Sequence, residues 1–319
     1  MLKRIVLSLS FSIVSLSYLN AFADSKQLGM GGVGGDIPVL NQGNFGTCAT
    51  FAGTAFLSAE LGLYGDDMIS PLCHLQVSRA SPGINWCHTT DGSDCHGLGA
   101  WAGSTNGQNV LEQISQYGYM SMNDQKIYLC GTSDGVYPFG TNAVPGNPIS
   151  VSTFHLTQKF TQHNVVDSSQ MWGENKITET KQQLKNGHRI LIGSLIYKDH
   201  NGYDYIDGYY KNIMDGWVLS PTISARLKVQ DKNYAGHEMI ITGYDDDACI
   251  TVKDASGKDY CPTYTNDSGQ NVEDRGVFTL RNSWGNGVGD SGTYYMSYEY
   301  YRFFVYEAIY IDKAGVSAS

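Results

Sequence analysis

Charged side chains are scarce in this sequence, and basic side chains are the scarcer kind. Only 16% of the 319 residues are charged, and 21 Lys and Arg are outnumbered by 31 Asp and Glu, which gives a net charge of −10. The basic residues form no run. Nucleic-acid phosphates and anionic membranes are bound by clusters of Lys and Arg. The composition therefore argues against both as partners.

Motifs for metals and nucleotides are also missing. No C-x-x-C pair occurs, which argues against a structural zinc site or a thioredoxin-like redox site. His237-Glu238 begins the zinc-peptidase pattern H-E-x-x-H, but Ile241 stands where the second histidine is required. Residues 29–34 match G-x-G-x-x-G, yet no strand is predicted before them and no helix after them. We expect no metal and no cofactor.

The long apolar run of this sequence lies at its start. Lys3 and Arg4 precede an apolar stretch over residues 5–19, and Ala21-Phe22-Ala23 follows as a small-x-small pattern. This order is typical of a secretory signal peptide cleaved after Ala23. The stretch is interrupted by serines and is short for a membrane span of about 20 apolar residues. We expect residues 1–23 to be removed, leaving a soluble secreted or periplasmic protein with no membrane span.

The rest of the sequence divides into a helical part and a strand-rich part. Residues 24–40 are small and glycine-rich and indicate a mobile lead-in. Apolar spacing of i, i+3 and i+4 predicts helices over residues 48–63 and 107–117. The second half has a predicted helix at 177–185 and predicted strands at residues 188–196, 237–244, 276–282, 293–298 and 303–311. The pattern predicts one α+β domain over 41–319, with lobes of about 41–150 and 151–319.

The most informative motif surrounds one cysteine. In Gln42-Gly43-Asn44-Phe45-Gly46-Thr47-Cys48, a glutamine precedes the cysteine and glycines form the turn between them. Cys48 opens the predicted helix, where the field of the helix N-terminus favours the reactive thiolate. The unpaired N–H groups of a first helical turn and the Gln42 side chain can donate hydrogen bonds to an oxyanion. The motif predicts a cysteine nucleophile with an oxyanion site.

Two later motifs supply partners for a thiolate. Gly236-His237 lies at the head of a predicted strand, and Asn282-Ser283-Trp284-Gly285 ends another. A nucleophilic cysteine needs a base that a third group holds in place. His237 is the candidate base and Asn282 the group that orients it. Trp284 would exclude water from their contact and strengthen it.

In this order, the three motifs resemble those of the papain-like cysteine peptidases. The resemblance implies a two-lobe fold with a helical N-terminal lobe and a β-barrel-like C-terminal lobe. It implies catalytic roles for Cys48, His237, Asn282 and Gln42, and substrate contacts at Gly97, Leu98, Gly236 and Trp284. The expected function is that of an exported, monomeric cysteine endopeptidase, a thiol protease that hydrolyses peptide bonds through a thioester on its cysteine.

Three positions depart from the family pattern and keep other functions open. Phe45 stands where a disulfide-forming cysteine is usual, Ala49 where an aromatic residue is usual, and Leu98 near a glycine that usually presents its backbone to substrate. These positions motivate a second hypothesis, a non-proteolytic binding or chaperone-like protein on the same fold. A third is a transglutaminase-like acyl transferase or transpeptidase, which usually orients its histidine with Asp where this chain has Asn282.

The sequence contains seven cysteines, and their number bears on which of them form disulfides. An odd number leaves at least one thiol outside any intrachain disulfide, and an oxidising compartment permits the others to pair. If Cys48 is the free thiol, we expect a disulfide between Cys249 and Cys261, which are close in a loop-rich region. Three pairings stay open for the remaining four cysteines, which are Cys73, Cys87, Cys95 and Cys130.

Overall fold

The computed structural model describes residues 24–32, 35–43, 46–77, 106–130, 160–166, 175–201, 204–266 and 268–313. The predictions for residues 1–23, Gly97, Leu98, Cys87 and Cys95 lie outside these ranges, as does Phe45. Within them, no helix has the length and apolar character that crossing a bilayer requires.

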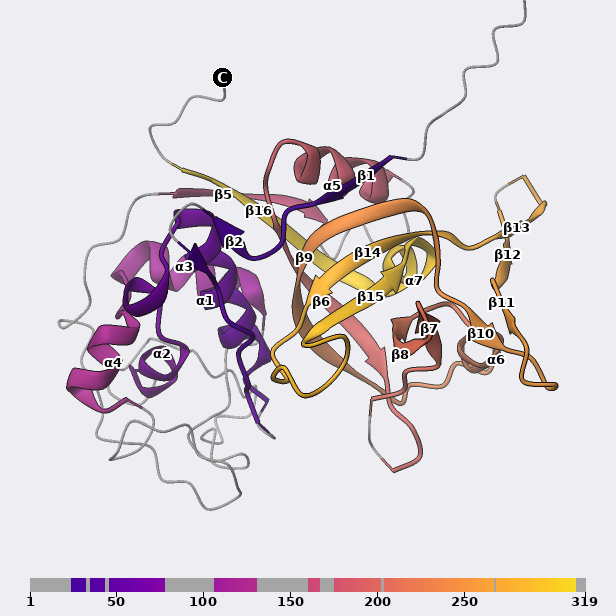
Figure 1. Cartoon of the computed structure of the whole chain (residues 1–319), viewed down its shortest axis with the longest axis horizontal. Coiled ribbons are helices and arrows are strands. Elements are labelled where there is room, and N and C mark those ends of the chain that lie inside the picture. The colour runs from indigo at the N-terminus through magenta and orange to yellow at the C-terminus, as the bar shows by residue number, and fades with distance from the viewer. Residues whose placement is uncertain are drawn as a thin grey trace, which may run out of the picture.

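Helices of the first half form one group, at the left of Figure 1. The central one, α1 (Cys48–Leu61), is buried along nearly its whole length and ends at Gly62, whose φ of 75° is left-handed. Helix α3 (Gly107–Tyr117) begins where Asn106 accepts a hydrogen bond from the backbone of Asn109. Both helices occur where the apolar spacing predicts them. The others in this group are η1 (Gly65–Asp67), α2 (Pro71–Val77) and α4 (Met122–Tyr128).

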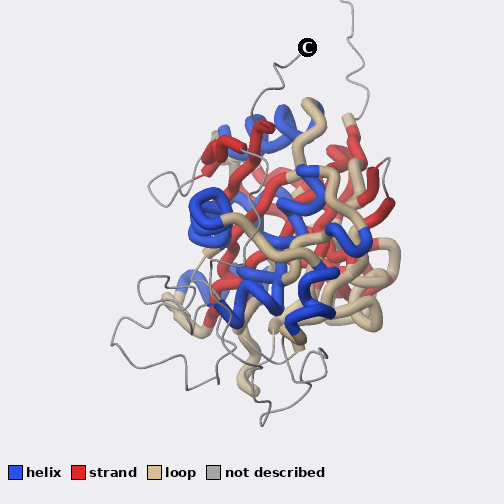
Figure 2. Tube along the Cα trace, turned by 90° about the vertical axis from the view of Figure 1, so that its left-hand side faces the viewer, coloured by secondary structure: helices blue, strands red, loops and turns tan. Residues whose placement is uncertain are grey.

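A nine-stranded sheet dominates the second half, and Figure 2 shows it behind the helices. Its strand order is β5-β16-β6-β9-β14-β15-β8-β7, and β1 pairs with β9 in addition. All pairs are antiparallel except β15 with β8. The strands are β1 (Ser25–Gln27), β5 (Phe160–Val166), β6 (Ile190–Tyr197), β7 (Gly208–Tyr210), β8 (Ile213–Trp217), β9 (Tyr234–Cys249), β14 (Arg275–Arg281), β15 (Thr293–Ser297) and β16 (Val305–Lys313).

Each face of this sheet buries a separate core. Successive side chains of a strand point to opposite faces, so the cores alternate along β6 and β9. Leu191 and Ile240 join the core that contains α1 and α3. Ile192 and Met239 join the other core, which includes side chains of α5 (Asn175–Lys185) and α7 (Tyr298–Phe304). Helices α1 and α3 are thus held against the sheet face that carries Leu191 and Ile240.

The second half does not close into a barrel. Its described strands follow an open order in which β5 and β7 lie at opposite ends, so the expected β-barrel-like lobe is corrected to an open mixed sheet. Closure is not needed to bury the apolar residues, because helices cover both faces. Residues 200–235 and 246–275, for which no helix or strand was predicted, contain α6 (Pro221–Lys228) and the short strands β10 (Val252–Lys253), β11 (Asp259–Tyr260), β12 (Thr263–Thr265) and β13 (Asn271–Glu273).

The glycine-rich segment before the first helix is hydrogen-bonded to the sheet. Strand β1 pairs with β9 at residues 243–245. Met30 and Ile37 are buried in the core of the helical group. The short strands β2 (Gly31–Gly32) and β3 (Gly35–Asp36) pair with each other between these two side chains. The segment therefore spans both halves of the molecule, an arrangement that its composition did not indicate.

Candidate active site

Cys48 is the first residue of α1 and the free cysteine among the described residues. Its side chain is half-buried where α1 meets β9. The backbone N–H groups of Cys48, Ala49 and Glu238 lie close enough to its sulfur to favour the ionised thiol. Glu238 directly follows His237 on β9, so the thiol lies beside the peptide that carries the candidate base.

Burial dominates the ionisation of this thiol. It raises the pKa of Cys48 to about 11, and Glu238, when it is ionised, acts in the same direction. The N–H groups of Cys48 and Ala49 lower the pKa, as a helix N-terminus should, but they do not offset the burial. The helix N-terminus therefore lowers the pKa of the thiol, as predicted, but burial raises this pKa by more.

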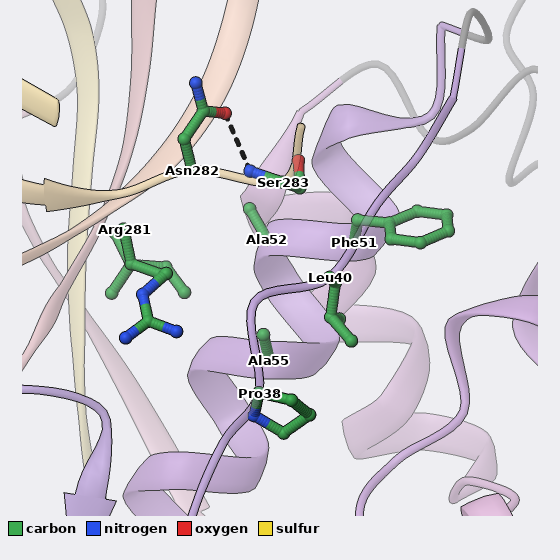
Figure 3. Close-up of a pocket in the computed structure, with 9 residues that line it drawn as sticks. Pro38, Leu40, Phe51, Ala52, Ala55, Arg281, Asn282 and Ser283 are labelled. Carbon is green, nitrogen blue, oxygen red and sulfur yellow. Dashed lines mark hydrogen bonds between the residues drawn. The ribbon is translucent and has the colours of Figure 1, made fainter. Parts of the chain in front are cut away.

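His237 is held in one orientation by Asn282. Its Nε2 lies 2.9 Å from Asn282 Oδ1, and that oxygen also accepts the backbone N–H of Ser283 at 2.7 Å, the dashed line in Figure 3. The second bond identifies the amide atom facing the ring as oxygen. An oxygen cannot donate, so Nε2 carries the proton and Nδ1 is the basic nitrogen. The site thus presents a neutral imidazole with a defined tautomer.

Trp284 covers this contact. Its ring stacks on the His237 ring with centroids 4.7 Å apart and planes 26° apart. Trp217 and Tyr294 pack against Trp284 from behind, with centroids at 6.1 and 5.4 Å. His237 is only 7% exposed, and burial lowers its pKa to about 4 in spite of the Asn282 hydrogen bond. The imidazole is therefore neutral over most of the accessible pH range.

Gln42 is hydrogen-bonded to Ser283, the residue that follows Asn282. Its backbone N–H donates to the Ser283 carbonyl at 2.8 Å, and the Ser283 hydroxyl donates to Gln42 Oε1 at 2.6 Å. Asn41 forms a β-bridge with Trp284, and the Gly285 N–H donates to the Leu40 carbonyl at 2.9 Å. Segment 40–42 of the helical half is thereby bound to segment 283–285 of the sheet. Because Oε1 is taken by Ser283, the Gln42 amide can offer Nε2 as a donor.

A pocket lies directly behind this turn (Figure 3). Residues of α1 form one wall and the end of β14 forms the other, and Leu40 lies between them. The walls are mainly apolar, apart from Arg281 and the Asn282–Ser283 turn. The pocket lies where the two halves meet, and neither Cys48 nor His237 lines it.

The remaining predicted residues divide into those that the structure places and those outside its described ranges. Gly236 precedes His237 on β9, and a Cβ added there would lie 3.2 Å from the Tyr306 hydroxyl. Gly97 and Leu98 lie outside the described residues. The structure contains the predicted Cys249–Cys261 disulfide and also a Cys73–Cys130 disulfide, while Cys87 and Cys95 lie outside the described residues. Within the described part of the chain, no cluster of His, Cys, Asp and Glu is arranged to hold a metal ion.

Sequence reasoning did not identify two contributors to the site. Ser283 orients both Asn282 and Gln42 through its N–H and hydroxyl. Glu238 lies against the thiol and is 2% exposed. The signal for Glu238 was a carboxylate directly after the candidate base and directly before the apolar run Met239-Ile240-Ile241.

Comparisons with known proteins concern the fold. No protein-family model and no curated protein sequence matches the chain. The structure is similar to the clostridial cysteine protease Cwp84 after propeptide cleavage, with a TM-score of 0.50, 17% identity, and coverage of 86% of this chain and 55% of that one. It also matches procathepsin L 3 of Tenebrio molitor larval midgut, with a TM-score of 0.45, 15% identity, and coverage of 93% and 72%. The values for the Carica candamarcensis cysteine protease CMS1MS2 are 0.48, 14%, 91% and 98%. These structural neighbours are papain-like cysteine proteases, and identities this low show the fold alone.

Proposed function

We propose that this protein is an exported papain-like cysteine endopeptidase that acts as a monomer on peptide or protein substrates. The observation that carries the proposal is the His237–Asn282 hydrogen bond under Trp284, in a chain whose free Cys48 lies against the next peptide N–H. The pairing of Cys73 with Cys130 and of Cys249 with Cys261 supports an oxidising compartment.

The proposed reaction begins with transfer of the Cys48 proton to Nδ1 of His237. Burial penalises either charge alone, but a thiolate and an imidazolium that form together offset each other. The sulfur attacks the peptide carbonyl carbon, and the oxyanion accepts hydrogen bonds from the Cys48 N–H and Gln42 Nε2. The imidazolium then gives its proton to the leaving amine, which leaves a thioester on Cys48.

Hydrolysis of the thioester completes the cycle. His237 takes a proton from water, the hydroxide attacks the thioester carbonyl, and the thiolate leaves. The sulfur regains the proton from the imidazolium, and the acid product departs. Throughout, the Asn282 oxygen holds Nε2–H, so the ring exchanges protons only at Nδ1.

The test is hydrolysis of fluorogenic peptides and of a denatured protein in the presence of a mild thiol reductant. We expect Cys48→Ala and His237→Ala each to reduce kcat/KM by about a thousandfold or more. His200→Ala is the matched control. His200 is exposed on a turn, so this variant should hydrolyse the substrates at the wild-type rate. Equal rates for wild type and Cys48→Ala would reject the peptidase assignment.

The raised pKa of Cys48 favours a non-proteolytic binding protein as the second candidate, because a thiol that stays protonated is a poor nucleophile. Product masses from one peptide incubation separate the candidates. A peptidase yields fragments, an acyl transferase yields crosslinked or ligated products, and a binding protein leaves the peptide unchanged.

A further inference from the structure

Two buried carboxyl groups face each other across a glycine on the sheet face that supports the candidate nucleophile. Gly193 of β6 pairs with Glu238 of β9 on one side and with Glu307 of β16 on the other. Glu238 lies in register with Ile240, and Glu307 with Ile309 and Ile311, whose side chains belong to the core containing α1 and α3. The two side chains are 2% and 6% exposed.

The neighbouring residues leave space for the pair. A Cβ added to Gly193 would lie 2.7 Å from Glu238 Oε1, and a Cβ on Gly107 would lie 3.2 Å from Glu238 Oε2. A register shift in β16 between Val305 and Glu307 inserts Tyr306 into the strand. The Tyr306 hydroxyl donates to Glu238 Oε1 at 3.4 Å. Larger residues at these glycines would displace the carboxyl.

The two carboxyl groups are not equivalent. Glu307 accepts the N–H groups of Gly107 and Gln108, at 3.1 and 3.3 Å, so it lies at the N-terminus of the eleven-residue helix α3. Glu238 Oε2 is buried and has no hydrogen-bond partner among the described residues. Two adjacent buried carboxyls do not both ionise readily. The negative charge therefore belongs on Glu307, and the proton on Glu238.

The groups that face Glu238 come from three other elements. Glu307 and Tyr306 approach from β16, Cys48 from α1, and the first N–H groups of α3 from above. The charge of Glu112 in α3 raises the pKa of Glu307. On its own strand, Glu238 follows His237, whose ring interacts with Asn282, Asp204 and Lys198. None of the described groups that act on the two carboxyls is a cationic side chain.

We propose that Glu238 is a positioning residue that acts through Cys48, and that its carboxyl must hold a proton for the thiol to reach its reactive, ionised form. The proposal rests on the assignment of Cys48 as the nucleophile. A carboxylate at Glu238 opposes a thiolate beside it, whereas a neutral carboxyl does not. Burial and the charge of Glu307 hold the pKa of Glu238 well above its usual range. As pH rises through the pKa of this carboxyl, its ionisation raises the pKa of the thiol, so the amount of thiolate increases less steeply with pH.

The experiment measures the rate of Cys48 alkylation by iodoacetamide against pH in the full chain, with the label located by peptide mapping. For wild type, the logarithm of the rate should flatten over the interval in which Glu238 ionises. Glu238→Gln should match wild type at low pH and exceed it above that interval by about tenfold, the equivalent of one pKa unit. The exposed Glu273→Gln on β13 is the matched control and should follow wild type.

Two further variants should move the flattening in opposite directions. Glu307→Gln removes the charge that opposes ionisation of Glu238, so the flattening should shift to lower pH. Tyr306→Phe removes a hydrogen-bond donor to the Glu238 carboxylate, so the flattening should shift to higher pH. Non-specific damage to the fold would not give opposite signs. If Glu238→Gln does not fold, opposite shifts in these two variants support the proposal, and unchanged profiles overturn it.

Parallel profiles for wild type and Glu238→Gln at every pH would also overturn the proposal. Alkylation reports ionisation of the thiol and does not require peptide hydrolysis. Failure of the peptidase assignment would therefore appear as equal hydrolysis by wild type and Cys48→Ala, while the alkylation profiles would test Glu238 separately.

Discussion

At the scale of single residues, the Asn282 oxygen determines which imidazole nitrogen is basic. It accepts both the Ser283 N–H and the His237 Nε2–H, and the second bond leaves Nδ1 as the base. A base with the wrong tautomer cannot take the thiol proton, however close it lies. The chemistry proposed for Cys48 therefore depends on a residue that acts through His237.

Removal of this oxygen should slow the reaction. We expect Asn282→Ala to lower kcat by about a hundredfold, because the imidazole loses its fixed orientation and tautomer. Asn282→Asp should retain more activity, since a carboxylate still accepts Nε2–H. Steady-state kinetics check both variants against Asn186→Ala, an exposed asparagine after α5. An Asn282→Ala enzyme with wild-type kcat would contradict the assigned role.

The acid limb of the pH profile provides a second prediction at this scale. Burial lowers the pKa of His237 to about 4, so the ring is neutral above that pH and protonated below it. A protonated ring cannot accept the Cys48 proton, and kcat/KM should fall to half as pH decreases through about 4. In Asn282→Ala the limb should shift to lower pH, because the lost hydrogen bond raises the pKa of His237 in the wild type. A wild-type limb near 6.5, the usual histidine value, would show a solvated ring instead.

The sequence was enough to name candidate residues for this site, but not to predict their electrostatics. The order and spacing of Gln42, Cys48, His237 and Asn282 were enough to propose that they meet. The degree of burial around the thiol was not, because it depends on Glu238 and on the packing of α1 against β9. That packing determines whether the helix N-terminus or desolvation has the larger effect on the pKa of the thiol. Here desolvation has the larger effect.

At the scale of elements, Arg189 joins the first helix, the first strands and the sheet. Its Nη1 donates to Glu60 of α1 at 3.0 Å, and its Nε and Nη2 donate to the carbonyls of Gly29 and Gly31 at 2.6 and 2.8 Å. The Arg189 and Glu60 side chains are 9% and 7% exposed. The buried charge of Glu60 is thus balanced from the start of β6.

Arg189→Met should therefore destabilise the fold strongly. The variant leaves a buried carboxylate and two carbonyls without their partner, which typically costs about 3–5 kcal/mol. Arg275→Met is the matched control, because the Arg275–Glu273 pair is about half exposed and an exposed pair contributes about 1 kcal/mol or less. Equilibrium urea unfolding compares the two. Equal losses of unfolding free energy would contradict the structural role of Arg189.

Elements with a clear period were predicted well, and elements defined by their caps were not. α1 and α3 show helical spacing, and the main strands of the sheet show apolar β-branched runs. No helix was predicted between the expected strands at residues 293–298 and 303–311, but Ser297 accepts the Tyr300 N–H and begins α7 there. In α6, Ser220 caps the helix and Pro221 occupies its first turn, in a segment without apolar period. Capping residues were the available signal in both.

At the scale of the whole molecule, two disulfides constrain the unfolded chain to different extents. Cys73–Cys130 joins residues 57 apart, and both half-cystines are fully buried in the helical half. Cys249–Cys261 joins residues 12 apart near the short outer strands. Longer closed loops lose more entropy in the unfolded state, so the two bonds should differ in their effect on stability.

The paired alanine variants test this difference. Loop-closure entropy predicts a loss of about 4 kcal/mol for Cys73→Ala with Cys130→Ala and about 3 kcal/mol for Cys249→Ala with Cys261→Ala. Cavities left in the core by the first pair should widen the gap. Denaturant unfolding without reductant measures both. A larger loss from the second pair would mean that loop length does not determine the order.

The halves meet at the site itself. Gln42 and Cys48 come from the helical half, and His237, Asn282 and Trp284 come from the open sheet (Figure 1). Backbone pairing between residues 40–42 and 283–285 holds the two sets in register. The central claim is that this junction forms a covalent acyl-enzyme.

Intact-mass spectrometry after rapid acid quench of a reaction with an activated peptide ester tests that claim most directly. We predict a mass increase equal to the acyl part of the ester, located on Cys48 by peptide mapping, absent from Cys48→Ala and lost as free acid appears. Turnover of the ester with no adduct on Cys48, or an equal adduct on Cys48→Ala, would contradict the account.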